Sequence, residues 1–303
     1  SKGRKKINQD FHDIHFPNEP QFTNRGIAVA LSDGISSSEV SQIASKTAVI
    51  SFLEDYYSTS ESWTVKKAAL RVLMATNSWL YSQSQQSKYH YDKNRGYVCT
   101  FSAIVLRSTT AHIFHIGDSR IYRLRGSKLE QLTKDHKLWV SKDKSYLSRA
   151  LGIDSEISID SDSFSMEKDD IYFLMTDGVF EFIKDNTLVD MATSYTDYDK
   201  LAIDIVNLAY ENGSDDNLTI QILRVDNLPD KNIDEVSNSF EMKPLPPILE
   251  TRMNFDGYTI TRELSASSRS HVYLAVDDET QTSVVLKIPS VDLSTDKEYL
   301  ERF

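Results

Sequence analysis

Five aspartates carry the chemistry that this sequence suggests, and each lies in a short turn-forming motif. The motifs are Asn8-Gln9-Asp10, Ser32-Asp33-Gly34, Gly117-Asp118-Ser119-Arg120, Thr176-Asp177-Gly178 and Gly213-Ser214-Asp215-Asp216-Asn217. Carboxylate oxygens without cysteine or paired histidine favour Mg²⁺, Mn²⁺ or Ca²⁺ over zinc. Carboxylates on opposing strands could hold two such ions roughly 3.5–4 Å apart, which is a hydrolytic arrangement. Taken singly, each motif is better explained as an ordinary turn, because Asp is common in turns and caps.

Two of these aspartates follow apolar runs of strand length. Ile27–Leu31 leads into Ser32-Asp33-Gly34, and Ile171–Met175 leads into Thr176-Asp177-Gly178. This pattern predicts a buried strand that ends in a tight turn, where glycine permits a sharp backbone path. A carboxylate at such a point lies on a rigid element and faces outward, where a metal ligand is useful.

The periodicity around these motifs predicts further helices and strands. Apolar residues at helical spacing predict three helices, from about Ser38 to Leu53, over Thr64–Ser84 and over Leu201–Ala209. Ser37 or Ser38 is available as the N-cap of the first, and Asn212-Gly213 ends the third. Strand-like segments are Val98–Leu106, Thr110–Ile116, Ser119–Leu124, Lys128–Leu132 and Leu218–Val225. We therefore expect an α+β domain over residues 1–226, with antiparallel sheets inside and helices outside.

Composition excludes several classes of protein. The net charge of −11 argues against nonspecific binding to nucleic acid or to an anionic membrane. Cys99 is the one cysteine and lies in an apolar run, so no disulfide or thiolate metal site is expected. There is no signal peptide at the start and no apolar run long enough to span a bilayer, so a cytoplasmic location is expected.

The composition changes after Val225. Residues 227–254 are polar and acidic, and the segment Lys243-Pro244-Leu245-Pro246-Pro247 cannot pair as a central strand, so this stretch is predicted to be a linker. Residues 255–303 form a second, β-rich segment. Its expected elements are strands at Tyr258–Leu264, His271–Val276 and Thr282–Ile288, and a helix at Ser294–Phe303.

Taken in order, seven motifs resemble those of the metal-dependent Ser/Thr protein phosphatases of type 2C (the PPM family), over roughly residues 3–226. The first motifs are Lys5-Lys6-Ile7-Asn8-Gln9-Asp10 for R-x-x-N-E-D, Asp33-Gly34-Ile35-Ser36-Ser37 through Ala44-Ser45 for D-G-x-G-G and A-S, and Gly117-Asp118-Ser119-Arg120 for G-D-S-R. The others are Leu132-Thr133-Lys134-Asp135-His136 for L-T-x-D-H, Leu147–Gly152 for L-T-R-A-L-G, Thr176-Asp177-Gly178 for S-D-G and Asp216-Asn217-Leu218-Thr219 for D-N-x-T.

The resemblance implies a four-layer α-β-β-α sandwich. Mn²⁺ or Mg²⁺ ions would lie in a channel at one end of its two antiparallel sheets. Asp33 would bridge two ions, supplemented by the Gly34 carbonyl, while Asp177 and Asp216 would bind one of them. Asp10 would support the centre directly or through water, and Asp118 matches the carboxylate of a weaker third ion. A bridging water made acidic by two cations would then attack phosphorus in line, with no covalent enzyme intermediate.

Several positions depart from the family pattern. Lys5 stands where an arginine usually grips the phosphate, so a positive charge is kept but bidentate geometry is lost. Gln9 replaces a glutamate and retains an oxygen for a metal-bound water. Ser36, Ser37 and Ser41 replace glycines. The segment between His136 and Leu147 is shorter than the usual flap, so substrate selectivity should differ.

The second segment resembles the first strands of a protein kinase small lobe. Val284-Val285-Leu286-Lys287 is similar to the V-A-I-K strand, so Lys287 would hold ATP phosphates in a full kinase. Ser265, Ser267 and Ser270 stand at the glycine positions of the phosphate loop. No H-R-D or D-F-G motif follows, so the kinase part of this chain is expected to be incomplete, within a longer phosphatase–kinase fusion.

These features predict a metal-dependent phosphatase for phosphoserine and phosphothreonine proteins, acting on the attached kinase or on its substrates. Two alternatives remain open. The first is a catalytically weak or inactive module that binds phosphorylated partners and regulates the kinase, which Lys5, Gln9 and the serine substitutions favour. The second is a phosphatase for small phosphorylated metabolites, which the short flap favours.

Overall fold

The computed structural model describes residues 1–141, 144–229, 247–255, 257–278 and 280–290. The chain divides into two compact units, Ser1–Glu235 and Val236–Phe303, and each is described by itself. Most of the predicted linker and the helix expected over 294–303 lie outside the described residues. Within the described ranges, no helix is both long enough and apolar enough to cross a membrane.

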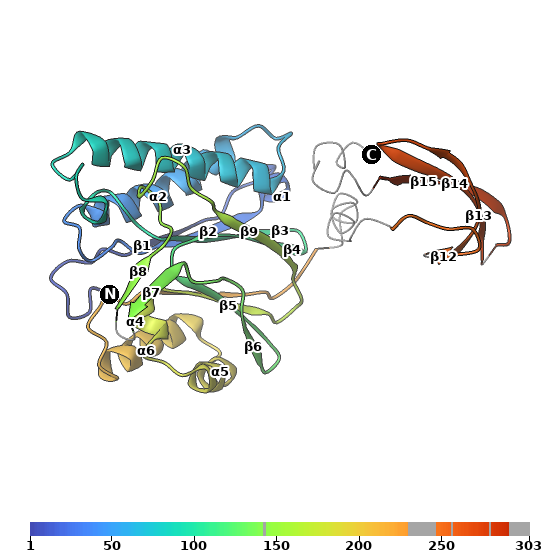
Figure 1. Cartoon of the computed structure of the whole chain (residues 1–303). Coiled ribbons are helices and arrows are strands. Elements are labelled where there is room, and N and C mark those ends of the chain that lie inside the picture. The colour runs from blue at the N-terminus through green and yellow to red at the C-terminus, as the bar shows by residue number, and fades with distance from the viewer. Residues whose placement is uncertain (142–143, 230–246, 256, 279, 291–303) are drawn as a thin grey trace. The chain divides into compact units, whose positions relative to one another are not determined.

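The first unit contains a five-stranded antiparallel sheet in the order β1-β2-β3-β4-β9. Helices α2 and α3 lie over one face of this sheet (Figure 1). The strands are Phe11–His15 (β1), Ile27–Ser32 (β2), Phe101–Arg107 (β3), Thr110–Ile116 (β4) and Asp160–Ser165 (β9), and the helices are Gln21–Arg25 (α1), Ser41–Asp55 (α2) and Val65–Gln86 (α3).

A second antiparallel sheet has the order β11-β10-β5-β6, and helices α4, α5 and α6 pack on it (Figure 1). A separate two-stranded hairpin, β7–β8, follows β6 in the chain. The strands are Arg120–Arg125 (β5), Lys128–Gln131 (β6), Lys137–Ser141 (β7), Lys144–Leu147 (β8), Ile171–Met175 (β10) and Ile220–Arg224 (β11), and the helices are Asp177–Phe180 (α4), Asp185–Ser194 (α5) and Tyr198–Glu211 (α6).

Side-chain alternation along the central strands explains how the layers pack. In β2, Ala28 and Ala30 belong to the core beneath α2 and α3, where small side chains let helices approach closely. Val29 and Leu31 belong to a different core, shared with Tyr172 and Leu174 of β10. The remaining residues of β10 pack with α4, α5 and α6. Each central strand is therefore buried on both faces, which explains the continuous apolar runs in the sequence.

Helices α2 and α3 begin in different ways. Thr64 caps α3, because its side chain accepts a hydrogen bond from Lys67 N. The predicted Ser37 or Ser38 cap of α2 is wrong, since the N-cap is Val40 and its side chain makes no cap. The Ser38 hydroxyl instead donates to the carbonyls of Arg95 and Gly96. A distant loop therefore uses the hydroxyl that would have capped the helix.

The turn expected after β10 is a one-turn helix, α4, and the role of its glycine differs from the prediction. Gly178 is absent from the residues with positive φ, so a sharp turn does not require it. A Cβ atom at Gly178 would lie 2.0 Å from the Asn217 carbonyl oxygen. Glycine is needed here because two backbone segments approach each other too closely for any side chain.

The second unit is a four-stranded antiparallel sheet in the order β12-β13-β14-β15. Its strands are Asn254–Phe255 (β12), Tyr258–Ala266 (β13), Ser270–Asp277 (β14) and Ser283–Pro289 (β15). A small core contains Leu249, Ile260, Tyr273, Ala275 and Ile288. The three longer strands lie where the sequence pattern placed them.

Candidate metal centre

Four of the five aspartates, although far apart in sequence, line one cavity of about 140 Å³. Asp33 follows β2, Asp118 lies in the turn between β4 and β5, Asp177 begins α4, and Asp216 precedes β11. The other lining residues are Ile35, Ser36, Thr100 and Leu147. The ends of strands from both sheets therefore deliver carboxylates to a common point.

Asp10 lies in the same region and is buried, with 6% of its surface exposed. Its Oδ2 atom accepts hydrogen bonds from Thr176 Oγ1 at 3.1 Å and from Thr219 Oγ1 at 2.6 Å. Its Oδ1 atom is buried and has no hydrogen-bond partner. A buried carboxylate oxygen without a donor is costly unless a cation or an ordered water satisfies it.

Thr100 fixes the position of Asp33. The Asp33 amide donates to Thr100 Oγ1 at 3.0 Å, and the Thr100 amide donates to the Asp33 carbonyl at 2.8 Å. The same hydroxyl is 2.8 Å from Ser119 Oγ, in the turn that carries Asp118. Thr100 therefore ties the end of β2 to that turn and sets the spacing of the two carboxylates.

Gly34 lies in a constriction between the segment that carries Asp10 and helix α2. Its amide donates to the Gln9 carbonyl at 3.2 Å. A Cβ atom at this position would lie 2.8 Å from that carbonyl and from Ser41. A side chain at residue 34 would therefore push the β2 end away from the Asp10 segment, which explains why glycine follows Asp33.

The carboxylates perturb one another strongly. Burial raises the pKa of Asp33 well above its ordinary value, and the charges of Asp10, Asp177 and Asp118 raise it further. Burial, together with Asp118 and Asp216, raises the pKa of Asp177 to about 7. Carboxylates shift in this way when they are crowded in a poorly solvated site without enough positive charge. A divalent cation would supply that charge and favour the ionised forms.

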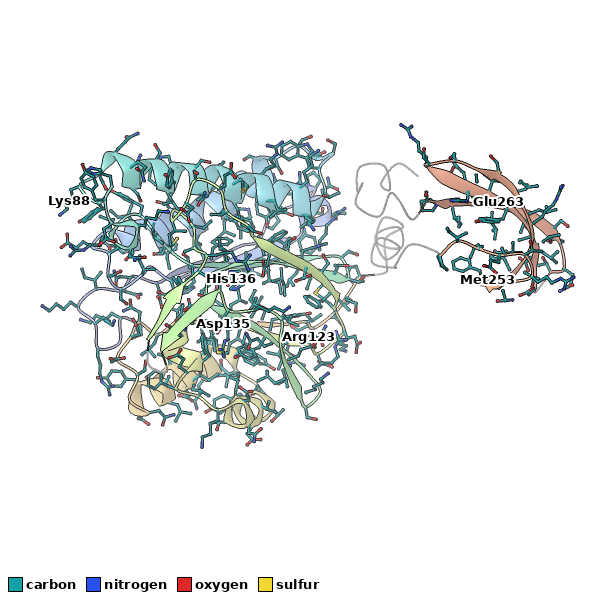
Figure 2. The ribbon with its side chains drawn as sticks, in the orientation of Figure 1. Lys88, Arg123, Asp135, His136, Met253 and Glu263 are labelled. Atoms are coloured by element: carbon teal, nitrogen blue, oxygen red, sulfur yellow. The ribbon has the colours of Figure 1, made fainter. Side chains whose placement is uncertain are left out.

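His136 holds the turn that presents Asp118. Gly117 in this turn has a φ of 116°, and its amide donates to His136 Nδ1 at 3.0 Å. The His136 amide donates back to the Gly117 carbonyl at 2.7 Å. Since Nδ1 accepts, the ring proton is on Nε2, which donates to Asp160 at 2.9 Å. His136 and Asp135 lie beside the β7–β8 hairpin (Figure 2).

Two lysines enter the acidic site from different segments. Lys137, the first residue of β7, places Nζ 3.0 Å from Asp118 Oδ2 and 3.3 Å from Glu181 Oε1. Lys5 places Nζ 3.3 Å from Asp216 Oδ2 and donates to Ser36 Oγ at 3.3 Å. Part of the negative charge is thus already offset by the protein itself.

The donor set fits a hard divalent cation, because every candidate ligand is an oxygen and Asp10 Oδ1 lacks a partner. Among the residues that the structure describes, no three His, Cys, Asp or Glu side chains already form a metal-binding cluster. Two of the carboxylates point to lysines instead. The ligand roles of Asp10, Asp33, Gly34, Asp118, Asp177 and Asp216 stay predictions.

Gln9 does not line the cavity, and its amide is engaged elsewhere. Its Nε2 atom donates to the Ser38 carbonyl at 2.8 Å and to Ser41 Oγ at 2.5 Å, at the start of α2. Its backbone amide donates to Asn217 Oδ1 at 2.8 Å. Gln9 thus joins three segments of the site, and its suggested contact with a metal-bound water stays a prediction.

Local sequence patterns do not indicate which residues support these aspartates. Thr176 and Thr219 occur in the family-like motifs, but their joint hydrogen bonding to Asp10 depends on contacts 166 and 209 residues apart in the chain. Lys137 directly follows His136 and carries no pattern that separates it from a surface lysine. The excess of acidic residues in the motifs was the one signal that a buried counter-charge was needed.

In the second unit, Lys287 of β15 lies opposite Val272 of β14. The turn at the serine positions is closed on itself, because Ser267 N donates to the Ser270 carbonyl and Ser270 N donates to Ser267 Oγ, both at 3.0 Å. The predicted role of Lys287 in holding ATP stays a prediction.

Comparison with known proteins agrees with the arrangement of these motifs. Residues 3–221 match the family model described as protein phosphatase 2C. The chain therefore belongs to the protein phosphatase 2C family. Its second unit lies outside the match.

Individual relatives are distant but match over more than 200 residues of the chain. The chain is 25% identical over 218 residues to "Serine/threonine phosphatase stp" of Listeria welshimeri, covering 64% of this chain and 83% of that protein. It is 25% identical over 240 residues to "Protein phosphatase PhpP" of Streptococcus pneumoniae, covering 73% and 93%. The solved Mycobacterium tuberculosis phosphatase PstP/Ppp shares the fold, with a TM-score of 0.61, 21% identity and coverage of 74% and 94%.

Proposed function

We propose that this protein hydrolyses phosphoserine and phosphothreonine in proteins and that its activity depends on Mn²⁺ or Mg²⁺. The observation that carries this proposal is the convergence of Asp33, Asp118, Asp177 and Asp216 on one small cavity, with the unsatisfied oxygen of Asp10 in the same cluster. Family membership and the names of the relatives support the same reaction class.

Different residues of the site would bind the ions and hold the ligands in position. Asp33, Asp177 and Asp216 would hold two ions, and Thr176 and Thr219 would fix Asp10 so that its Oδ1 atom is available. When bound, the cations neutralise phosphoryl oxygens and make a water acidic enough to act as nucleophile. Lys5 lies at the cavity rim, where its ammonium would attract the phosphate.

The pairing of Lys5 with Asp216 defines its expected contribution. Both side chains are about one-third exposed, at 33% and 31%, so the pair is weakly held and can open when phosphate arrives. A lysine binds phosphate as a point charge without the fork geometry of arginine. We therefore expect modest substrate affinity, with the metal site supplying most of the catalysis.

The direct test is hydrolysis of an aryl phosphate and a phosphothreonine peptide with Mn²⁺, with and without chelator. Activity should require Mn²⁺, and Asp33→Asn or Asp177→Asn should lower kcat/KM by about 10³-fold or more. Asp190→Asn on the exposed face of α5 is the matched control for loss of one negative charge. Full activity in Asp33→Asn or Asp177→Asn would contradict the proposal.

A second candidate is a phosphate-binding regulatory module with little turnover. The observation that favours it is the pairing of Lys5 and Lys137 with two of the candidate ligands. Calorimetry separates the candidates, since a catalytic centre must bind Mn²⁺ in the micromolar to low millimolar range. Phosphopeptide binding without Mn²⁺ binding would favour the regulatory module. Turnover of small phosphometabolites in preference to phosphopeptides would instead favour a metabolite phosphatase.

Three finer features belong to this proposal. A four-layer α-β-β-α arrangement is supported by three separate cores, one between the sheets and one beneath each helical layer. A kinase small lobe in residues 255–303 is supported by the antiparallel order of β13, β14 and β15, with Lys287 on β15. The kinase or its substrates would then be the phosphoproteins on which the enzyme acts, in the cytoplasm.

A further inference from the structure

Lys137 occupies a position that a surface lysine would not take. Its side chain is 12% exposed, and that of its partner Asp118 is 9% exposed. Burying an ammonium group is unfavourable unless carboxylates compensate its charge. Two do so here, because Nζ lies 3.0 Å from Asp118 Oδ2 and 3.3 Å from Glu181 Oε1.

The backbone holds the two residues of this pair next to each other. His136 and Gly117 exchange hydrogen bonds, in which the His136 amide donates to the Gly117 carbonyl and the Gly117 amide donates to the His136 ring. Lys137 and Asp118 are the next residues on each side of that connection. The pair is therefore held by its neighbours and does not depend on a chance orientation of two flexible side chains.

The ammonium and a divalent cation compete for the same kind of ligand. Asp118 lines the cavity with Asp33, Asp177 and Asp216, so its carboxylate is available to an ion held there. Lys137 Nζ takes one oxygen of that carboxylate and an oxygen of Glu181. A lysine ammonium is a compact point charge with three donors, which suits it to stand in for a weakly held ion.

We propose that Lys137 is a built-in counter-cation for Asp118 and takes the place of a third divalent ion, so that the centre binds two. This inference rests on the proposed metal-dependent function. It assigns Lys137 as a positioning residue whose effect is on the number of ions bound. It also predicts that the enzyme saturates with Mn²⁺ in a single concentration range.

The experiment counts Mn²⁺ ions bound per chain, by electron paramagnetic resonance of free Mn²⁺ during titration. The full chain is compared with Lys137→Met, Lys137→Arg and the double variant Lys137→Met with Asp118→Asn. Lys134→Met is the matched control, because Lys134 is an exposed lysine on the same segment. Melting temperatures in chelator and in excess Mn²⁺ provide a readout that is independent of catalysis.

We expect one additional Mn²⁺ in Lys137→Met, and none in Lys137→Arg, Lys134→Met or the double variant. Lys137→Met should melt at a lower temperature than the parent protein in chelator and recover in excess Mn²⁺. If Lys137→Met does not fold in chelator, the unchanged count in Lys137→Arg and folding of Lys137→Met in Mn²⁺ still test the proposal.

Equal Mn²⁺ counts in the parent protein and in folded Lys137→Met would overturn the inference and leave the proposed function intact. The inference also fails if Lys137→Met only raises KM, since Lys137 would then be a phosphate ligand. Absence of Mn²⁺ binding by the parent protein would instead overturn the proposed function, and the inference with it.

Discussion

The two sides of the acidic cavity handle buried charge in opposite ways. On one side, Asp118 is paired with Lys137, and its turn is held by His136. On the other side, Asp33 is surrounded by carboxylates, and Asp10 has an oxygen without any partner. Burial raises the pKa of both Asp118 and Asp33, but Lys137 opposes the rise at Asp118 whereas neighbouring carboxylates add to it at Asp33. The difference supports the proposal that cations bind on the side of Asp33 and Asp10.

The largest expected effect is on the free energy of unfolding, measured in chelator. Substitutions on the two sides of the cavity should change it in opposite directions. Asp118→Asn should destabilise the first unit by about 3 kcal/mol, because Lys137 loses its closer partner while buried. Asp33→Asn should stabilise it, because it removes a carboxylate with a raised pKa from a negative site. All three tryptophans lie in this unit, so urea unfolding by tryptophan fluorescence reports on it.

The control for this pair is Asp190→Asn, which removes one negative charge from an exposed position. It should change the unfolding free energy by less than about 0.5 kcal/mol. Destabilisation of equal size by both cavity substitutions would contradict the proposed contrast between the two sides.

The second effect is the dependence of stability on pH, on the side of the cavity that contains Asp118 and Lys137. Burial lowers the pKa of His115 to about 4, and the ring is bonded to Ser102 and to the Lys134 carbonyl. Between pH 6.5 and 4 the unfolded chain binds a proton that the folded chain does not. Stability should therefore fall by roughly 3 kcal/mol as pH drops through that window.

His115→Gln isolates this contribution, because glutamine can keep a hydrogen bond but does not titrate. Urea unfolding should show that the free energy of unfolding falls more between about pH 7 and about pH 4 in the parent protein than in His115→Gln. An identical pH dependence in both proteins would show that another group causes the acid sensitivity.

A smaller effect is expected at Asp10. Thr219→Val removes the 2.6 Å hydrogen bond to Asp10 Oδ2, while the bond from Thr176 remains. Stability should fall by about 1–2 kcal/mol, because the lost bond is to a charged group. Thr219→Ser keeps the hydroxyl and should retain most of the stability. If Thr219→Val leaves the free energy of unfolding unchanged, Thr176 alone positions Asp10.

The smallest effect is expected at the rim. Lys5→Ala should raise KM for a phosphopeptide by less than about 5-fold, because an exposed charge contributes less than about 1 kcal/mol. Lys5→Arg should lower KM slightly, since arginine can bind phosphate in a bidentate manner. Initial rates at saturating Mn²⁺ measure both variants. A large fall in kcat for Lys5→Ala would place Lys5 in the chemical step.

The sequence predicted the parts of the fold that are encoded by local periodicity. Strand β10 was found because Ile171–Met175 is apolar on both faces, and α6 because its apolar residues repeat at helical spacing. The sequence does not predict strands β1 and β9, and both are edge strands of the first sheet. Edge strands are polar on their exposed parts, so Asp160–Ser165 has no apolar pattern to detect.

The site was predictable only where motifs carry the ligands themselves. Asp33 and Asp177 stood out because each ends an apolar run. The pairing of Lys137 with Asp118 was not predictable, because it depends on the loop geometry that His136 imposes. The use of Ser38 was missed for a similar reason, since its hydroxyl is bound by a loop 57 and 58 residues further along the chain. Long-range hydrogen bonds leave no periodic trace in a sequence.

The link between the first and last parts of this unit has a consequence for its synthesis. Asp10 is bonded to Thr219, which lies 209 residues later, and Gln9 is bonded to Asn217. Closing so long a loop costs chain entropy before any contact is gained, and such connections slow folding. A nascent chain can therefore form α2, α3 and most of both sheets while the cavity is still incomplete. The cavity should therefore be completed only after β11 leaves the ribosome.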